Sequence, residues 1–186
     1  MTAFPGRKIP LPDTPARCDA FSHCIPNPNE DSMELNQKVD NFTLQDDQDK
    51  TVSLTDFAGK PVVLFFYPKA DTPGCTIEAC GFRDTFEKLQ AAGAVVLGIS
   101  RDTPKAQRKF REKFNLPYSL LADVDEKVCN QFGVLKEKNM YGKKVMGIER
   151  TTFVIGPDQT LLQIFPKVKP EGHAEEVLAS LQAHKG

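Results

Sequence analysis

A chain of 186 residues, 40% of them hydrophobic and 26% charged, has the composition of a soluble globular protein with one sizeable core. Its 24 basic and 25 acidic residues leave a net charge of −1 without the lysine and arginine block that binds a phosphate backbone, which argues against nucleic acid as a partner. No apolar run approaches the ~18 residues of a membrane helix and no secretory signal opens the chain, so we expect a cytoplasmic protein.

The first 34 residues are predicted to be an extension separate from the folded domain. They hold six of the fourteen prolines and show little apolar periodicity, which is typical of a disordered segment. We therefore expect a disordered extension over residues 1–34 and a folded domain over residues 35–186. A further hypothesis is that the functional protein begins at Met33, where the domain pattern starts.

The first part of the domain is predicted to be a hairpin, a strand and a helix. Two short runs, residues 42–44 and 51–54, flank an acidic turn and predict a β-hairpin. Residues 62–66 are continuously apolar between two prolines, which predicts a buried strand. Apolar side chains then recur at helical spacing over residues 77–91, and Gly93 is a suitable stop for that helix.

Strands and helices continue to alternate through the rest of the domain. The predicted strands are residues 95–99, 118–121, 152–155 and 161–165, of which the last two form a hairpin. The predicted helices are residues 104–114, capped by Asp102-Thr103-Pro104, then 125–132, and a final amphipathic helix around 174–181. Residues 136–147 are predicted to be a loop.

This order predicts an α/β sandwich with a mixed sheet of about five strands covered by helices. A doubly wound dinucleotide fold is the competing architecture. It would need a Gly-x-Gly-x-x-Gly after the first buried strand, or a Gly-x-x-x-x-Gly-Lys-Ser/Thr, and the sequence has neither. A cysteine, Cys75, stands in the turn where those folds place phosphate-binding glycines.

Cys75 is placed on the first turn of the helix that follows the buried strand. The N–H groups and the dipole at a helix N-terminus favour an anion, so a thiol there ionises more easily than a free one. The alternative is a buried structural thiol, which packs as a small hydrophobe. Five cysteines, an odd number in a chain that needs no disulfides for its core, favour redox chemistry in a reducing compartment. The polar, tightly turned surroundings also favour a reactive thiol: Asp71, Thr72, Pro73, Gly74 and Thr76.

A thiolate needs a hydrogen-bonding neighbour and a fixed cation. Thr72, three residues before the cysteine, can place a hydroxyl beside the sulfur, or it is simply the N-cap of the helix, and the two roles are compatible. No arginine precedes Arg83 in this segment, so the cation must come from elsewhere in the fold. Arg150, just before the strand 152–155, is a candidate; the alternative is that it is one of many surface arginines.

The spacing of Cys75 and Cys80 has a mechanical consequence. Five residues along an ideal helix separate the two Cα atoms by roughly 8–9 Å, whereas a disulfide needs less than about 7 Å. The first turns of the helix must therefore unwind before the sulfurs can join, and Gly74 and Gly81 make that easier. This suits two cysteines that react in sequence, through a sulfenic acid and then a disulfide. A Cys-x-x-Cys exchanger would need no such rearrangement, which argues against a thioredoxin-type reductase.

The motif Pro68-x-x-x-Thr72-x-x-Cys75 matches the active-site signature of the peroxiredoxins. The segment 66–84 resembles the peroxiredoxin Q subfamily, also called bacterioferritin comigratory protein, and the resemblance extends over about residues 40–184. Two departures stand out. Residues 36–42 keep only the phenylalanine of the Gly-x-x-Ala-Pro-x-Phe pattern common in this family, and the extension with its two cysteines has no counterpart there.

The resemblance implies a thioredoxin-like fold in which Cys75 is the peroxidatic cysteine and Cys80 the resolving cysteine of the same chain. Pro68 would shield the sulfur, Thr72 would hydrogen-bond the peroxide, and Arg150 would hold the thiolate and polarise the O–O bond. Thioredoxin or a glutaredoxin-like dithiol donor would supply electrons, without metal, haem or flavin. A resolving cysteine within the chain removes the need for a dimer, so we expect a monomer or weak homodimer.

Other candidate residues have simpler explanations. Cys129 is expected in the core and is the fallback resolving cysteine. Glu78 suits the helix dipole and needs no further role unless it orients an arginine. His173 and His184 are expected at the surface. The extension contains three possible metal ligands, Cys18, His23 and Cys24, but their spacing matches no known zinc pattern. A disulfide within the extension, or thiols without a role, is favoured over a metal site.

The sequence therefore favours a thiol peroxidase that acts on hydrogen peroxide and small organic hydroperoxides in antioxidant defence. A redox sensor is the alternative, in which oxidation of Cys75 changes a partner surface and turnover is incidental. Sustained peroxide consumption coupled to a dithiol donor would distinguish the enzyme from the sensor.

Overall fold

The structure, a computed structural model, describes residues 33–140 and 143–184. The candidate ligands Cys18, His23 and Cys24, and nearly all of the predicted extension, lie outside the described residues. No helix in the described part of the chain is long and apolar enough to cross a membrane.

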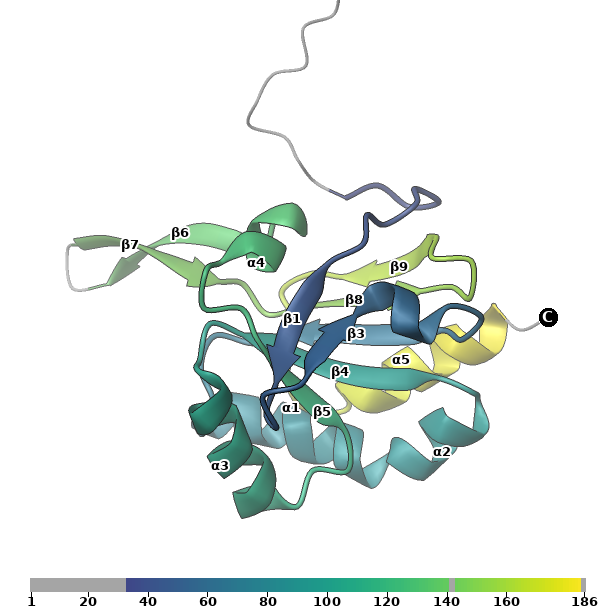
Figure 1. Cartoon of the computed structure of the whole chain (residues 1–186), viewed down its shortest axis with the longest axis horizontal. Helices are drawn as coiled ribbons and strands as arrows, with labels where there is room; N and C mark the ends of the chain where they lie inside the picture. The colour runs from purple at the N-terminus through teal and green to yellow at the C-terminus, as the bar shows by residue number, and fades with distance from the viewer. Residues whose placement is uncertain (1–32, 141–142, 185–186) are drawn as a thin grey trace, which may run out of the picture. The chain divides into compact units, whose positions relative to one another are not determined.

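A mixed sheet forms the centre of the domain (Figure 1). Within the described residues it has seven strands in the order β2-β1-β5-β4-β3-β8-β9. Their bounds are β1 Thr43–Asp46, β2 Thr51–Ser53, β3 Val62–Phe66, β4 Val95–Ser100, β5 Ser119–Ala122, β8 Thr151–Ile155 and β9 Leu161–Phe165. Strands β3, β4 and β5 are parallel, while β8 runs antiparallel to β3. The predicted five-strand sheet is present, and the N-terminal hairpin extends it to seven because β1 pairs with β5.

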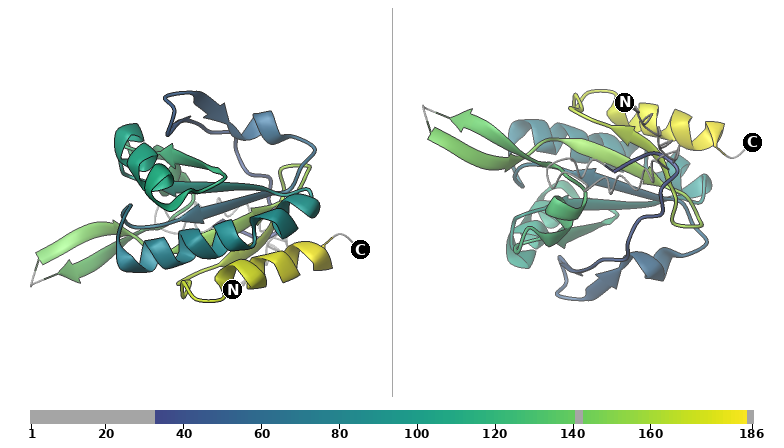
Figure 2. Two further views of the ribbon diagram at one scale, coloured as in Figure 1. Left: turned by 90° about the horizontal axis from the view of Figure 1, so that it is seen from below. Right: turned by 90° about the horizontal axis from the view of Figure 1, so that it is seen from above.

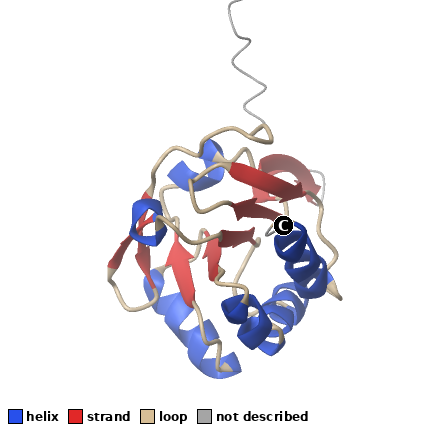
Figure 3. Cartoon of the chain, turned by 90° about the vertical axis from the view of Figure 1, so that its right-hand side faces the viewer, coloured by secondary structure: helices blue, strands red, loops and turns tan. Residues whose placement is uncertain are grey.

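Apolar cores lie on both faces of the sheet. One core contains residues of α1 (Pro73–Asp84), α2 (Phe86–Ala91), α3 (Pro104–Phe114) and α5 (His173–Ala183). The other contains residues of α4 (Lys127–Gln131) and the 3-10 turn η1 (Leu54–Phe57). Figure 3 shows most of the helical ribbon on one side of the strands. All five residues of β3 are buried, as expected for a strand covered on both faces.

Two predictions about these elements are wrong. The helix predicted over residues 77–91 is two helices, α1 and α2, separated at Thr85, and its apolar spacing continues across the break. Residues 136–147, predicted to be a loop, belong to the hairpin β6 (Leu135–Met140) and β7 (Lys143–Ile148), which projects from the sheet in Figures 1 and 2. Val145 and Met146 of this hairpin are exposed, so no pattern of burial marks its strands in the sequence.

His173 is also predicted wrongly, since it lies in the core rather than at the surface. Its ring is 1% exposed and lies edge-on to the rings of Phe82 and Phe165. Its Nε2 is 2.8 Å from the Thr152 hydroxyl, and its Nδ1 is 3.4 Å from Glu176. In the sequence, His173 is only a histidine at the start of an amphipathic helix, with no pattern that predicts its burial. It becomes buried because α5 packs on the sheet.

The strand ends place three segments at one edge of the sheet. Thr151 of β8 pairs with Phe66 of β3, so Arg150 lies beside the point where β3 leaves the sheet. Strand β4 is parallel to β3 and ends at the same edge, with Ser100. The loop from β3 to α1, the start of β8 and the loop after β4 therefore meet there.

Replacing His173 by glutamine should flatten the dependence of stability on pH. Burial lowers the pKa of His173 from 6.5, and the nearby Arg150 charge acts in the same direction while Glu176 opposes it. The unfolded chain then binds more protons, so the free energy of unfolding of the wild type falls as the pH drops below about 6.5. Urea denaturation across this range should show a smaller fall in His173→Gln. The exposed His184→Gln variant is the control, and parallel curves for wild type and His173→Gln would contradict this expectation.

Candidate active site

Cys75 lies in the first turn of α1, directly after the loop that leaves β3. Thr72 is the N-cap residue, with extended backbone, and Pro73 begins the helix with the φ angle that a first turn requires. The sulfur is almost enclosed, because Cys75 is 2% exposed and belongs to the same buried cluster as Tyr67 and Ala79. A thiol at this position faces the positive end of the helix dipole and has little contact with water.

Arg150 brings a positive charge to the sulfur. Its Nη2 donates to Cys75 Sγ over 3.4 Å. Gly74 leaves room for this contact, because a Cβ atom at that position would lie 3.1 Å from the same Nη2 and would crowd it. Arg150 is itself largely buried, with 15% of its side chain exposed, so its charge is weakly screened by solvent. A guanidinium in this position stabilises a thiolate, and with its remaining N–H groups it can polarise a second ligand atom.

Glu78 binds the second terminal nitrogen of the Arg150 guanidinium. One carboxylate oxygen accepts a hydrogen bond from Arg150 Nη1, and the side chain is fully buried. The other oxygen, Oε1, has no partner among the described residues. Burial raises the pKa of Glu78 to about 7, and the attraction of Arg150 offsets this only in part. Glu78 therefore orients the arginine, the role that the sequence analysis left conditional. The signal was present in its spacing, since residues three apart on a helix share a face.

Pro68 and Thr72 lie in the loop before the helix, and both are half-buried. The Thr72 hydroxyl makes no capping bond to the first turn of α1 and instead donates to the Lys69 carbonyl over 3.0 Å. Its oxygen keeps lone pairs for another donor. The predicted N-cap role of Thr72 therefore holds for the backbone but not for the side chain.

Cys80 is half-buried and has a free thiol one and a half turns further along α1. Because the helix is continuous from Pro73 to Asp84, its Cα lies roughly 8–9 Å from that of Cys75 by helix geometry. The two sulfurs cannot bond in this conformation.

Cys129 is fully buried in the core on the far side of the sheet from α1. Its backbone N–H donates to Asp123 Oδ2 over 2.6 Å. Burial, followed by the charge of Asp123, strongly raises the pKa of the Cys129 thiol. A thiol kept neutral in this way is a poor nucleophile, in agreement with its expected place in the core.

Among the described residues, no group of three or more His, Cys, Asp or Glu side chains is placed to hold a metal ion. The site that the structure does assemble contains a nearly enclosed thiol, a guanidinium in contact with it and a buried carboxylate that orients the guanidinium. Such a site can hold a thiolate and stabilise negative charge on an atom that the thiolate attacks.

Replacing Glu78 by glutamine should change how stability varies with pH. Because the pKa is raised from 4.5 to about 7, the folded protein binds this proton more tightly than the unfolded chain does. That contribution is complete below pH 4.5 and is lost as the pH rises through about 7. Relative to Glu78→Gln, the wild type should lose up to about 1.4 kcal/mol of unfolding free energy per pH unit in this window. Urea denaturation at several pH values measures this free energy, and Glu87→Gln, which replaces an exposed glutamate, is the control. If the difference in unfolding free energy between wild type and Glu78→Gln were constant across the window, the buried-proton explanation would be refuted.

Comparisons with known proteins agree with this geometry. Residues 35–164 match the AhpC/TSA family. The chain is 53% identical over 150 residues to the putative peroxiredoxin bcp of Coxiella burnetii, covering 81% of this chain and 99% of that protein. It is 44% identical over 151 residues to peroxiredoxin Bcp of Bacillus subtilis, covering 81% and 96%.

Solved structures show the same relationship. The bacterioferritin comigratory protein of Xanthomonas campestris, studied for its alkyl peroxide reduction activity, superposes with a TM-score of 0.75 at 43% identity, covering 78% of this chain and 92% of that one. A mutant of Xylella fastidiosa PrxQ gives a TM-score of 0.79 at 37% identity, covering 83% and 98%. These relatives support a thiol-dependent peroxidase with the thioredoxin-like fold. The chain therefore belongs to the AhpC/TSA family, and its relatives place it among the peroxiredoxins of the Bcp, or Q, type.

Proposed function

We propose that this peroxiredoxin reduces hydrogen peroxide and small organic hydroperoxides at Cys75, that Cys80 resolves the product as an intrachain disulfide, and that thioredoxin or a glutaredoxin-like dithiol protein restores both thiols. The observation that carries the proposal is the 3.4 Å contact between Arg150 and the sulfur of a cysteine at the N-terminus of a helix. The reduction of alkyl peroxide by the Xanthomonas relative supports the same substrate class here.

In the first step the Cys75 thiolate attacks the terminal oxygen of the peroxide. The S–O bond forms as the O–O bond breaks, so sulfur is oxidised to sulfenic acid and the peroxide leaves as alkoxide or hydroxide, which takes a proton from solvent. Negative charge moves from sulfur to the leaving oxygen during this step. Because Arg150 already contacts the sulfur, its guanidinium can stabilise this negative charge as it moves to the leaving oxygen. Thr72 is the proposed hydrogen-bonding group for the peroxide, and Pro68 the proposed shield against water.

In the second step the Cys80 sulfur attacks the sulfenic sulfur of Cys75. A disulfide forms, and water leaves with the sulfenic oxygen. Since both residues lie in the continuous helix α1, this step requires its first turns to unwind. A dithiol donor then reduces the disulfide by exchange and is itself oxidised. One peroxide thus consumes two electrons, both supplied by the donor.

Replacing Arg150 by methionine should slow the oxidation of Cys75 by peroxide roughly 100- to 1,000-fold, the usual cost of losing one hydrogen-bond donor that stabilises a transition state. Methionine keeps much of the apolar stem but removes the charge beside the sulfur. Stopped-flow kinetics of sulfenic acid formation measures the rate. Arg111→Met is a matched control, since Arg111 is also largely buried and ion-paired, with Asp47. Equal rates in Arg150→Met and wild type would rule out the arginine as the charge-stabilising group.

Replacing the two cysteines separately should divide the reaction into its steps. Cys75→Ser should consume no peroxide, because no thiolate remains at the helix N-terminus. Cys80→Ser should complete one oxidation per chain and leave a sulfenic acid that a dimedone-type reagent traps. Mass spectrometry identifies the products, with Cys129→Ser as the control that behaves as wild type. Full recycling of Cys80→Ser by thioredoxin would exclude the resolving role, and one turnover per wild-type chain with every dithiol donor would favour a redox sensor.

A further inference from the structure

A buried chain of hydrogen bonds lies behind the loop that joins β3 to α1. The Tyr67 hydroxyl donates to Oε1 of Gln107, a residue of α3. Gln107 Nε2 donates in turn to Ser100 Oγ at 2.8 Å, and also to the Leu121 carbonyl at 3.0 Å. The two bonds made by its amide nitrogen fix which way the Gln107 side chain points. Its oxygen is therefore available to Tyr67.

The chain of bonds returns to the loop through Asp102. The Ser100 hydroxyl donates to Asp102 Oδ2 over 2.7 Å, and the same oxygen accepts the backbone N–H of Ala70, also at 2.7 Å. Tyr67 and Ala70 are thus the two ends of one network, and they flank Pro68 and Lys69. The network closes a ring around the residues that lead to the cysteine.

This network is placed where polar groups are costly unless they are satisfied. Ser100 and Gln107 are fully buried, and Tyr67 is 1% exposed. Burial raises the pKa of Tyr67, so its hydroxyl remains a donor. A core that only needed to be stable would be served as well by apolar side chains of similar volume. A satisfied buried network instead fixes one arrangement of the backbone it touches.

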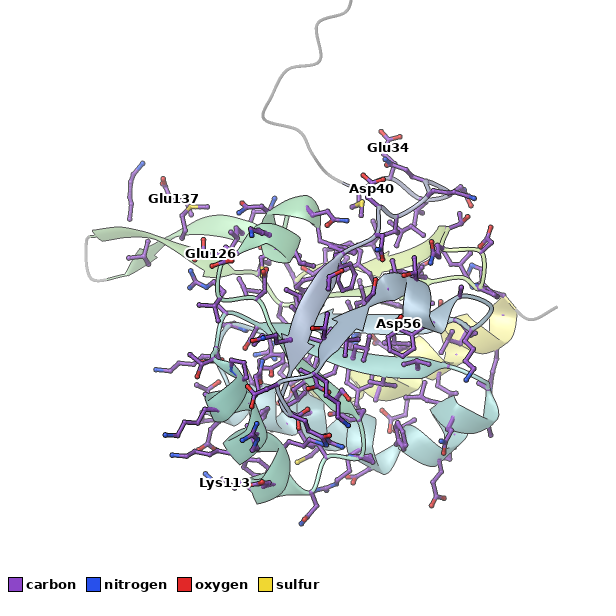
Figure 4. All side chains as sticks on the ribbon, in the orientation of Figure 1. Glu34, Asp40, Asp56, Lys113, Glu126 and Glu137 are labelled. Atoms are coloured by element: carbon purple, nitrogen blue, oxygen red, sulfur yellow. The ribbon has the colours of Figure 1, made fainter. Side chains whose placement is uncertain are left out.

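A surface contact adds a weaker second anchor to the same loop. Lys113, at the C-terminal end of α3 and labelled in Figure 4, lies 2.7 Å from both carboxylate oxygens of Asp71. Asp71 has a left-handed backbone with φ of 58°, which marks the sharp turn before the helix. Both side chains are about half exposed, so solvent screens this pair. Asp102, which binds the backbone itself, is the stronger restraint.

The loop is connected to the reacting groups through Lys69. The Thr72 hydroxyl donates to the Lys69 carbonyl, and Lys69 lies between the two ends of the ring. We propose that Asp102, held by Ser100 and Gln107, is a positioning residue for peroxide reduction, because it fixes residues 67–70 and thereby sets Pro68 and the Thr72 hydroxyl against Cys75. This inference rests on the proposed function, since it concerns the peroxide step.

The same arrangement separates the fixed part of the site from the part that must move. Every bond of the ring is made by residues 67–70, 100–107 and 121, and none by residues of α1. The helix can therefore unwind for the second step without breaking the ring. Asp102 serves the attack on peroxide and is not required for closure of the disulfide.

Asp102→Ala should lower the rate constant for oxidation of Cys75 by hydrogen peroxide roughly 10- to 100-fold, the usual cost of a misplaced reacting group. Alkylation of Cys75 by iodoacetamide should stay at the wild-type rate, because it needs the thiolate and Arg150 but not the peroxide-binding groups. Asp102→Asn keeps an oxygen that accepts the Ala70 N–H and should recover most of the peroxide rate. Asp125→Ala removes an exposed aspartate in the loop after β5 and should match wild type in both reactions.

The ratio of the two rate constants decides the result, with peptide mass spectrometry used to follow Cys75. Equal losses in both reactions, or an unchanged peroxide rate, would overturn the positioning role. If Asp102→Ala does not fold, Ser100→Ala, which removes one bond to the same carboxylate, should give a smaller loss confined to the peroxide reaction, and an unchanged ratio there would also overturn it. Failure of the wild type itself to react with peroxide at Cys75 would reject the proposed function, and this inference with it.

Discussion

The candidate active site depends on one guanidinium that two groups share. Arg150 contacts the Cys75 sulfur with one nitrogen and the Glu78 carboxylate with the other. A buried arginine without a counterion would be costly, and a thiolate without a cation would be poorly stabilised. Because burial raises the pKa of Glu78 to about 7, the charge of the carboxylate varies around neutral pH. The carboxylate therefore both orients Arg150 and competes with the sulfur for its charge.

Backbone geometry makes this contact possible. The pairing of Phe66 with Thr151 places Arg150 at the edge of the sheet where β3 ends, and the missing side chain of Gly74 leaves room for the guanidinium above the first turn of α1. The parallel strand β4 brings Asp102 to the same edge. Three segments far apart in the sequence thus meet because strands of one sheet end together, the usual location of sites in α/β proteins.

In the proposed mechanism the site must be rigid for one step and mobile for the next. Attack on peroxide needs a folded helix N-terminus and fixed hydrogen-bonding groups, whereas disulfide formation needs the first turns of α1 to open. The structure divides these demands between two segments. The loop over residues 67–70 is bonded to a buried network, while Gly74 and Gly81 lie beside the two cysteines in the helix that the proposed second step unwinds. Glycine lowers the cost of that opening because it weakens the helical state.

The sequence alone was sufficient for the local features. The continuous apolar run of β3, the capped start of α3 with its Thr103 bond, and the cysteine on the first turn of α1 each depend on neighbouring residues, so their patterns are visible in the chain. The spacing of Cys75 and Cys80 showed that a disulfide requires unwinding. The exposed hairpin β6–β7 was missed, since its strands bury no regular face that a pattern could reveal.

Contacts between distant segments were decided only by the tertiary structure. The pairing of Glu78 with Arg150, the burial of His173 where α5 packs on the sheet, and the bond from the Ala70 N–H to Asp102 each join elements whose proximity depends on strand order and register. Sequence periodicity reports which face of an element is apolar, but not which element covers it. By itself the sequence therefore determined where the candidate reactive sulfur lies and how far its proposed partner lies along the helix. Tertiary packing decided which charges surround that sulfur, because those charges come from other strands and helices.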